Sequence, residues 1–280
     1  MKQKTKNNLA RFFVLYIPLF LFMAFIVFPL LWAMSLSFRD GASIISKEFR
    51  FLPKSFMIDN YRYVWNTVKL SQFFKNSLIT SFGCVFFVGL MSLMNGYALS
   101  RIDFGFKRPF MIILLMTQMV PMVFNISAIF ILMTKLNLNN SLFGIILLHI
   151  AASLPYNSLM MKSFISGVPR EIDEAASLDG CTQVQTLWHV ILPAVRPGFV
   201  TVIAYSFITC WNEYLVSYTL LTDASKFPIS VGLKYLQGEF STDYGALAAG
   251  CVIALIPPVL LFAYVQRHLV EGMNAGAVKG

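Results

Sequence analysis

The stretch VPREIDEAASLDGCTQVQTLWHVILPAVRPG, residues Val168 to Gly198, places four carboxylates between long apolar segments. Pro169 suits the first position of a helix, where its missing N–H is no loss. Gly180 can end that helix in the left-handed conformation. Thr182 and Gln185 then have the capping-box spacing that opens a second helix. The stretch is therefore predicted to form a helix–glycine–helix element.

The two predicted helices are amphipathic in different ways. The first has its carboxylates near the positive N-terminal end, where they are favourable. Its apolar face holds Ile172, Ala175 and Ala176, and the two alanines leave room for another backbone to approach. The second helix carries an apolar stripe of Val184, Leu187, Trp188 and Ile191.

Two surfaces could receive such an element, lipid headgroups or a protein. Helices that rest on headgroups usually present Lys and Arg on their polar face. The first helix is acidic instead, with Glu171, Asp173 and Glu174 in its first turns. A protein partner is therefore the favoured interpretation, and the lipid surface remains the alternative.

The composition of the whole chain is that of a membrane protein. Of its 280 residues, 57% are hydrophobic and 12% are charged, whereas soluble domains carry about 25% charged residues. Six long segments, the fifth broken only by Glu213, exceed the ~20 residues that a helix needs to cross the hydrocarbon core. We therefore predict an all-α membrane protein with six transmembrane helices. The six segments are 12–38, 76–100, 109–134, 136–161, 197–221 and 244–266.

The first segment is too long for the core of a cleaved signal peptide, so it is interpreted as an uncleaved span. Loop lysines and arginines account for most of the net charge of +9, which does not point to nucleic-acid binding. The positive-inside rule favours cytoplasmic termini only weakly, because the loop 39–75 is itself basic. We place both termini and the helix–glycine–helix element in the cytoplasm.

The chain lacks the sequence motifs of several common binding sites. There is no G-x-x-x-x-G-K-[ST] sequence, so the chain does not bind ATP by a P-loop. The three histidines are scattered without ligand spacing, which predicts no metal site. Four cysteines, three of them in predicted spans, suggest no disulfide framework.

A longer pattern within the quoted stretch points to a particular family of proteins. Glu174-Ala175-Ala176, then Gly180, then Val190, Leu192 and Pro193 match E-A-A-x3-G-x9-I-x-L-P, with Val for Ile as the one departure. The chain resembles the membrane subunits of binding-protein-dependent ABC importers. The resemblance runs from about residue 74 to the C-terminus. The segments WNEYL (211–215) and QRHLVEGMNAGAVKG (266–280) resemble the carbohydrate branch, in particular the smaller maltose-transporter type of permease subunit.

This resemblance implies the fold of a type I importer transmembrane domain, with a cytoplasmic coupling helix that sits in a groove of a separate ATPase. It also implies three regions: an N-terminal region of residues 1–75, a core of residues 76–267 with the coupling loop at 165–197, and a cytoplasmic tail of residues 268–280. The ATPase contact would fall on Glu174, Ala175, Ala176, Leu178, Asp179 and Gly180. The tail contact would fall on Gly276, Ala277, Val278, Lys279 and Gly280.

The partners implied are a second, homologous permease, an ABC ATPase dimer, an extracytoplasmic solute-binding protein and membrane lipid. No cofactor is expected in this chain, since ATP and Mg would bind in the partner ATPase. The chain is accordingly expected to be a transport component and not an enzyme.

A polar stripe on the fifth predicted span is the candidate solute path, because charged and polar residues inside spans usually line a pathway or contact a partner. Its members recur on one helical face. The alternatives are that Glu213 pairs with the partner permease or reaches the outer interface, and that single polar residues only join helices. The candidate path residues are Tyr205, Thr209, Asn212 and Glu213, with Asn157 and Asn125 on other spans.

Two hypotheses of different class follow. The first is a permease subunit of an ATP-driven importer, with a sugar or oligosaccharide as its solute and alternating access as its mechanism. The second is a secondary transporter driven by an ion gradient, for which Glu213 would be the coupling carboxylate. The absence of internal repeats, and a docking element with no use in such a transporter, count against the second.

Overall fold

The computed structural model describes residues 12–41, 44, 51–53, 56–234, 236–237 and 242–277. It divides into two compact units. Unit 1 comprises Met1–Leu70 and Tyr235–Leu255, and unit 2 comprises Ser71–Lys234 and Ile256–Gly280. Helix α15 (Tyr244–Ala277) contributes to both units.

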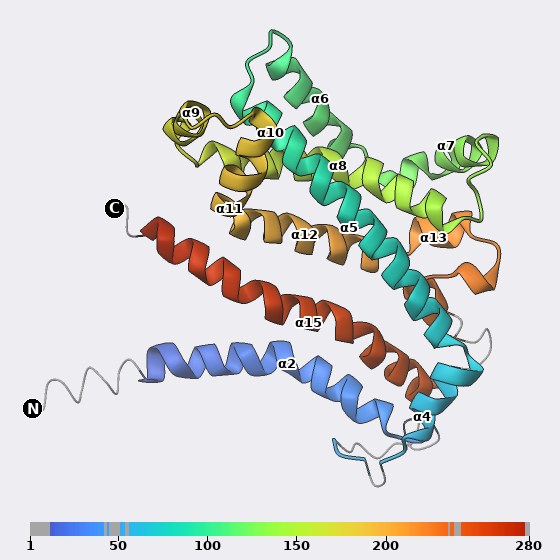
Figure 1. Cartoon of the computed structure of the whole chain (residues 1–280). Coiled ribbons are helices and arrows are strands. Elements are labelled where there is room, and N and C mark those ends of the chain that lie inside the picture. The colour runs from blue at the N-terminus through green and yellow to red at the C-terminus, as the bar shows by residue number, and fades with distance from the viewer. Residues whose placement is uncertain are drawn as a thin grey trace, which may run out of the picture. The chain divides into compact units, whose positions relative to one another are not determined.

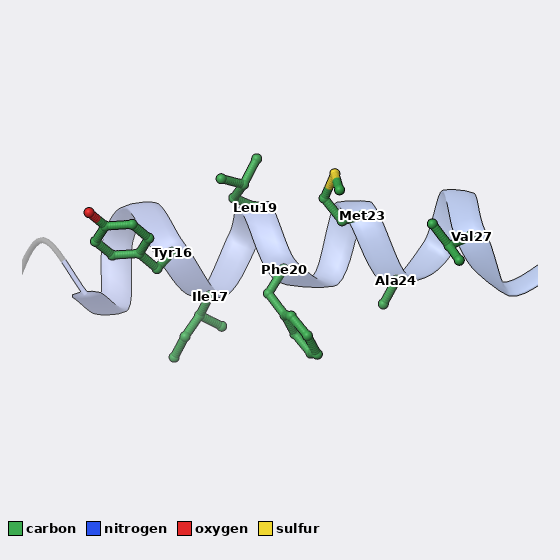
Figure 2. A pocket seen from close by; sticks show the side chains of 7 residues that line it. All are labelled: Tyr16, Ile17, Leu19, Phe20, Met23, Ala24 and Val27. Carbon is green, nitrogen blue, oxygen red and sulfur yellow. The ribbon is translucent and has the colours of Figure 1, made fainter. Parts of the chain in front are cut away.

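Unit 1 is built around a helix that is apolar on all sides. After the π-helical turn η1 (Phe12–Tyr16), α2 (Ile17–Ser37) is exposed along most of its length. An open apolar groove of about 690 Å³ runs along α2 from Tyr16 to Val27 (Figure 2). This surface suits contact with hydrocarbon chains, as predicted for the first span.

The C-terminal end of α2 is held by polar contacts inside unit 1. Asn60, in α4 (Asp59–Arg62), donates to the carbonyls of Ser37 at 2.9 Å and Arg39 at 2.8 Å. The Ser37 hydroxyl lies 2.7 Å from the Tyr61 hydroxyl. These bonds satisfy backbone groups where the helix stops, so the end of α2 is fixed to α4. The π-helical turn η2 (Tyr63–Thr67) follows α4.

Unit 2 is helical in every regular element that the structure describes. Its order begins with α5 (Leu70–Arg101, whose first residue lies in unit 1), α6 (Lys107–Met119), α7 (Met122–Lys135), α8 (Leu142–Ser166) and α9 (Arg170–Leu178). It continues with α10 (Gln183–Thr186), the π-helical η3 (Leu187–Ile191), α11 (Leu192–Ala194), α12 (Arg196–Trp211), α13 (Leu215–Leu220), the 3₁₀ turn η4 (Ala224–Lys226) and α14 (Ile229–Lys234).

Within the described residues, four helices are long and apolar enough to cross a membrane. They are Phe13–Ser37, Leu70–Arg101, Leu142–Ser166 and Tyr244–Gln266. Two bent pairs bring the total to as many as six if each pair counts as one span: α6 with α7, and Gln183–Ala194 with Arg196–Trp211. The structure therefore supports four to six spans.

The predicted third span, 109–134, is not one helix. It bends by 97° between α6 and α7. Val120 is extended, with φ −87° and ψ 113°, and Pro121 follows it. Proline lacks the N–H of the helical ladder and disfavours helical backbone in the residue before it, so the break falls at this point.

The predicted fourth span is displaced, and the predicted fifth is interrupted. The fourth begins at Leu142, because Asn137 and Asn140 adopt positive φ values of 54° and 49° in the preceding turn. Asparagine tolerates this conformation better than most residues. In the fifth, α12 ends at Trp211 and a short turn leads into α13.

One apolar cluster joins the element α9–α11 to the long helices of unit 2. It is formed by buried side chains of α5, α8, α12 and η3, including Leu93, Met161 and Ile191. Helices α5 and α8 approach closely beside it, since a Cβ on Gly96 would lie 2.8 Å from the Lys162 backbone nitrogen. In unit 2, α9–α11 lie at one end and α7 with α13 at the other (Figure 1).

Candidate functional site

The helix–glycine–helix element forms as predicted. Helix α9 ends at Leu178, and Gly180 has a φ of +84°. The capping box opens α10: the Thr182 N–H donates to Gln185 Oε1 at 2.8 Å, and the Gln185 N–H donates to Thr182 Oγ1 at 3.4 Å. Both predictions from local sequence are confirmed here. The one difference is that α9 begins at Arg170, so Pro169 precedes the helix.

The predicted apolar stripe of the second helix is wrong in half of its members. Leu187 and Ile191 are buried, whereas Val184 is 65% and Trp188 41% exposed. The chain changes from α to π geometry at Leu187, which widens each turn and shifts the face that later residues present. Trp188 therefore lies outside the core. Val184 precedes the π turn, in α10, and is exposed there.

The residues predicted to contact an ATPase fall mostly on the surface of this element. Leu178 is 89% exposed, and Glu174, Ala175, Asp179 and Gly180 are exposed as well. An exposed leucine next to acidic side chains is a mixed surface that suits a protein partner. The sixth member of the predicted set, Ala176, is 6% exposed and packs within the chain.

The base of α9 is tied to the end of α5 by a residue that the sequence did not single out. Arg101, the last residue of α5, has its Nη2 atom 2.9 Å from Asp173 Oδ2. The same nitrogen donates to the Val168 carbonyl at 2.9 Å. Because these partners lie 67 and 72 positions from Arg101, no local pattern could reveal them. A hollow of about 530 Å³, lined by Arg101, Asp173 and Glu174 among others, opens beside the pair.

Near Arg101, the loop between α5 and α6 carries an exposed ion pair. Lys107 donates to Asp103 Oδ1 at 3.1 Å. The hydrogen bond and charge of Lys107, with a smaller contribution from the charge of Arg170, lower the pKa of the Asp103 carboxyl. This carboxylate is therefore ionised at neutral pH.

Glu213, the candidate coupling carboxylate, caps a helix. Its Oε1 accepts from the Val216 N–H at 2.6 Å, and its Oε2 accepts from the Ser217 N–H at 3.1 Å and the Ser217 hydroxyl at 2.8 Å. These bonds satisfy the first turn of α13, and the negative charge is favourable there. The buried His149 lies 3.8 Å away, from Nε2 to Oε2. Sequence reasoning missed this neighbour, because α8 and α12 are brought together only by folding.

The other candidate path residues separate into two groups. Tyr205, Thr209 and Asn212 are exposed on α12 and its C-terminal end, and Asn125 is exposed on α7. Asn157 is fully buried and donates to the Ser153 carbonyl at 2.8 Å. The structure thus brings Tyr205, Thr209 and Asn212 onto one surface, while Asn157 lies inside the helix packing.

Tyr156 on α8 lies beside Tyr205 on α12. Their ring centroids are 4.9 Å apart, with the ring planes at 44°. Their side chains are 42% and 43% exposed, and neither phenolic hydroxyl has a hydrogen-bond partner among the described residues. Polar groups in the middle of a span need such partners when lipid surrounds them.

The predicted tail contact is only partly visible. Gly276 and Ala277 end the helical backbone of α15, and Val278, Lys279 and Gly280 lie outside the described residues. No group of three or more His, Cys, Asp or Glu side chains suited to a metal ion occurs in the part of the chain that the structure describes.

Comparison with known proteins gives consistent matches over most of the chain. Residues 92–275 match the family described as binding-protein-dependent transport system inner membrane component. The chain is 31% identical over 255 residues to the diacetylchitobiose uptake system permease protein DasC of Streptomyces coelicolor, a match that covers 91% of this chain and 92% of DasC. It is 32% identical to the arabinooligosaccharides transport system permease protein AraQ of Halalkalibacterium halodurans, covering 100% of each chain.

The fold has solved counterparts. A chain of a bacterial ABC transporter involved in the import of the acidic polysaccharide alginate superposes with a TM-score of 0.81 at 22% identity. That match covers 93% of this chain and 97% of the other. At this level of identity the likeness concerns the fold alone, and it agrees with the predicted type I importer architecture.

Proposed function

The chain belongs to the family of binding-protein-dependent transport system inner membrane components, and from this premise we propose that it is the permease subunit of an ATP-driven sugar importer. It would span the membrane six times, with the bent pair α6–α7 as the third span, residues 197–221 as the fifth and both termini in the cytoplasm. Residues 1–75 would hold the first span, 76–267 the core and 268–280 a cytoplasmic tail. The chain would form half of the solute path and leave ATP hydrolysis to a partner.

The observation that carries this proposal is the surface of α9. Leu178 is almost fully exposed at the end of a helix whose base is pinned by Arg101 to α5. An exposed apolar anchor on a fixed support is what a docking surface requires. Glu174, Ala175, Leu178, Asp179 and Gly180 would contact the ATPase, and the buried Ala176 would set how closely α9 packs on its own chain.

The solute class is inferred from the relatives and from the aromatic pair. The names of the two relatives given above, DasC and AraQ, include sugars: diacetylchitobiose and arabinooligosaccharides. Tyr156 and Tyr205 offer ring faces and unpartnered hydroxyls in the middle of two helices. Aromatic faces and hydroxyl groups together suit the apolar and polar faces of a sugar ring. We place Tyr205, Thr209 and Asn212 on the path, with Asn125 as a further member.

The transport cycle would use alternating access. Closure of an ATPase dimer would draw together the coupling elements of this chain and a second, homologous permease. Helices α5, α8 and α12 would follow, because the apolar cluster around Met161 and Ile191 packs η3 against them. A solute-binding protein outside the cell would deliver its sugar to the opened path, and ATP hydrolysis would restore the inward-facing state.

Co-purification with the ATPase tests the proposal. The tagged chain is coexpressed with its candidate ATPase and second permease, and Gly180→Trp is compared with Gly105→Trp. Both glycines have no atom within 4 Å of an added Cβ, but only Gly180 lies on the proposed docking surface at positive φ. We expect Gly180→Trp to lose the ATPase and Gly105→Trp to keep it.

The same preparations are then reconstituted for uptake of labelled oligosaccharide. Uptake that needs ATP and the binding protein supports the importer. Uptake driven by a proton or sodium gradient without ATP would instead support the secondary transporter. The occupation of both Glu213 oxygens by hydrogen bonds to α13 argues against that alternative.

A further inference from the structure

Arg101 lies where three elements of unit 2 meet. Its Nη2 atom lies 2.9 Å from Asp173 on α9 and 2.9 Å from the carbonyl of Val168, which follows α8. The Arg101 side chain is 9% exposed and that of Asp173 is 17% exposed. One guanidinium therefore connects the end of α5, the turn after α8 and the first turns of α9.

Weaker contacts surround this ion pair. The hydroxyls of Ser100 and Ser166 lie 3.0 Å apart and join the ends of α5 and α8. Arg170, the first residue of α9, donates to the Ser100 carbonyl at 3.4 Å and lies 3.9 Å from Asp103. Its side chain is 57% exposed, so these contacts compete with water. The Arg101–Asp173 pair is the buried connection.

The charges of this pair depend on one another. The Asp173 carboxylate faces the Arg101 guanidinium and the Tyr97 hydroxyl of α5, and among the described residues Arg101 Nε has no acceptor. A buried charge without its partner is strongly unfavourable. If Arg101 is lost, Asp173 gains by moving into water, and α9 can swing out because most of its surface is already exposed.

We propose that Arg101 and Asp173 are positioning residues that hold the coupling helix in the orientation in which the ATPase binds it. The inference rests on the proposed function. The pair fixes α9 to the cytoplasmic end of α5 before any partner arrives, so little ordering remains to be done on docking. Movement of the ATPase then reaches α5 through the ion pair as well as through the apolar cluster.

The test uses the assembled transporter with its second permease, ATPase and binding protein. Variants are Arg101→Leu, Asp173→Asn and the charge exchange Arg101→Asp with Asp173→Arg. Arg170→Ala is the matched control, since it removes an exposed arginine from the same helix. Measured quantities are the affinity of the ATPase for the permease pair, sugar uptake per ATP hydrolysed, and the thermal stability of the chain.

A spectroscopic measurement on the chain with its second permease separates positioning from folding. Spin labels replace Glu171 on α9 and Phe106 after α5, both exposed, with Cys181 and Cys251 changed to serine. We expect one narrow distance distribution in the natural background. In Arg101→Leu the distribution should broaden, while the unfolding temperature of the chain changes little, because the freed Asp173 carboxylate can move into water with α9.

The expected result is an ATPase affinity at least tenfold weaker in both single variants, recovery in the charge exchange, and a change below twofold in Arg170→Ala. Single variants that bind the ATPase as the natural chain does, with an unchanged label distance, would overturn the positioning role. So would a charge exchange that remains as weak as the single variants while the label distance stays narrow. A natural chain that binds no ATPase would instead overturn the proposed function.

Discussion

Replacement of Glu213 tests whether this residue caps helix α13 or carries an ion during transport. In the structure its two oxygens accept three hydrogen bonds from Val216 and Ser217. Loss of a side chain that caps a helix destabilises by about 0.5–2 kcal/mol. Partly buried donors left without an acceptor raise this cost toward about 3 kcal/mol. We therefore expect Glu213→Ala to lower the free energy of unfolding by roughly 1–3 kcal/mol.

Glu213→Gln keeps the shape and one acceptor oxygen, so about half of that loss is expected, with sugar uptake retained once the complex has assembled. Unfolding is followed by SDS titration in mixed micelles, and uptake is measured in proteoliposomes at equal amounts of assembled complex. Asp223→Asn is the matched control, because Asp223 also accepts from a backbone N–H and a hydroxyl, both of Ser225, but is exposed. Glu213→Gln with normal stability and no uptake would refute the cap as its main role and would restore the ion-coupling hypothesis.

Three further predictions concern the two ends of unit 2. Leu178→Asp should weaken ATPase binding at least tenfold in a pull-down titration without lowering the stability of the chain, because the Leu178 side chain is already in water. Unchanged binding would contradict the proposal that Leu178 belongs to the ATPase docking surface. Asn140→Gly should lower the melting temperature, because Asn140 Oδ1 accepts from the N–H groups of Thr222 and Asp223. Asn137→Gly, at a similar φ, is the control. Equal decreases in melting temperature for the two variants would contradict a stabilising role of the Asn140 hydrogen bonds. Hydrogen bonds from Ser225 lower the pKa of the Asp223 carboxyl. The contribution of the Asp223 carboxylate to the free energy of unfolding should therefore persist at neutral pH and disappear only on acidification below about pH 4. A stability difference between Asp223→Asn and the natural chain that is lost already near pH 6 would contradict a lowered pKa.

Local patterns predicted the form of the helix–glycine–helix element well. The capping box and the left-handed glycine depend on hydrogen bonds between residues at most a few positions apart, and both are present. The break in the third predicted span could have been predicted too. Pro121 stands in the middle of that segment, and the residue before a proline disfavours helix.

The roles of buried polar residues could not be predicted in the same way. Glu213 looked like an expensive intramembrane charge, yet its charge is satisfied by the first turn of α13 and lies near His149 from another helix. Val184 and Trp188 fit an α-helical stripe, but both are exposed, and the π geometry of η3 turns Trp188 away from the core. The cap on α13 joins residues only three and four positions apart, whereas the neighbour His149 comes from a helix distant in sequence.

The sequence alone determined the membrane class, the family and the local shape of the helix–glycine–helix element, because hydropathy and capping are properties of neighbouring residues. Only the tertiary structure decided that Ala176 is buried while Leu178 is exposed, that Tyr156 meets Tyr205, and that Arg101 holds Asp173. These contacts join positions separated by many turns of chain. Their energies arise from burial and charge pairing, which exist only after the helices have packed.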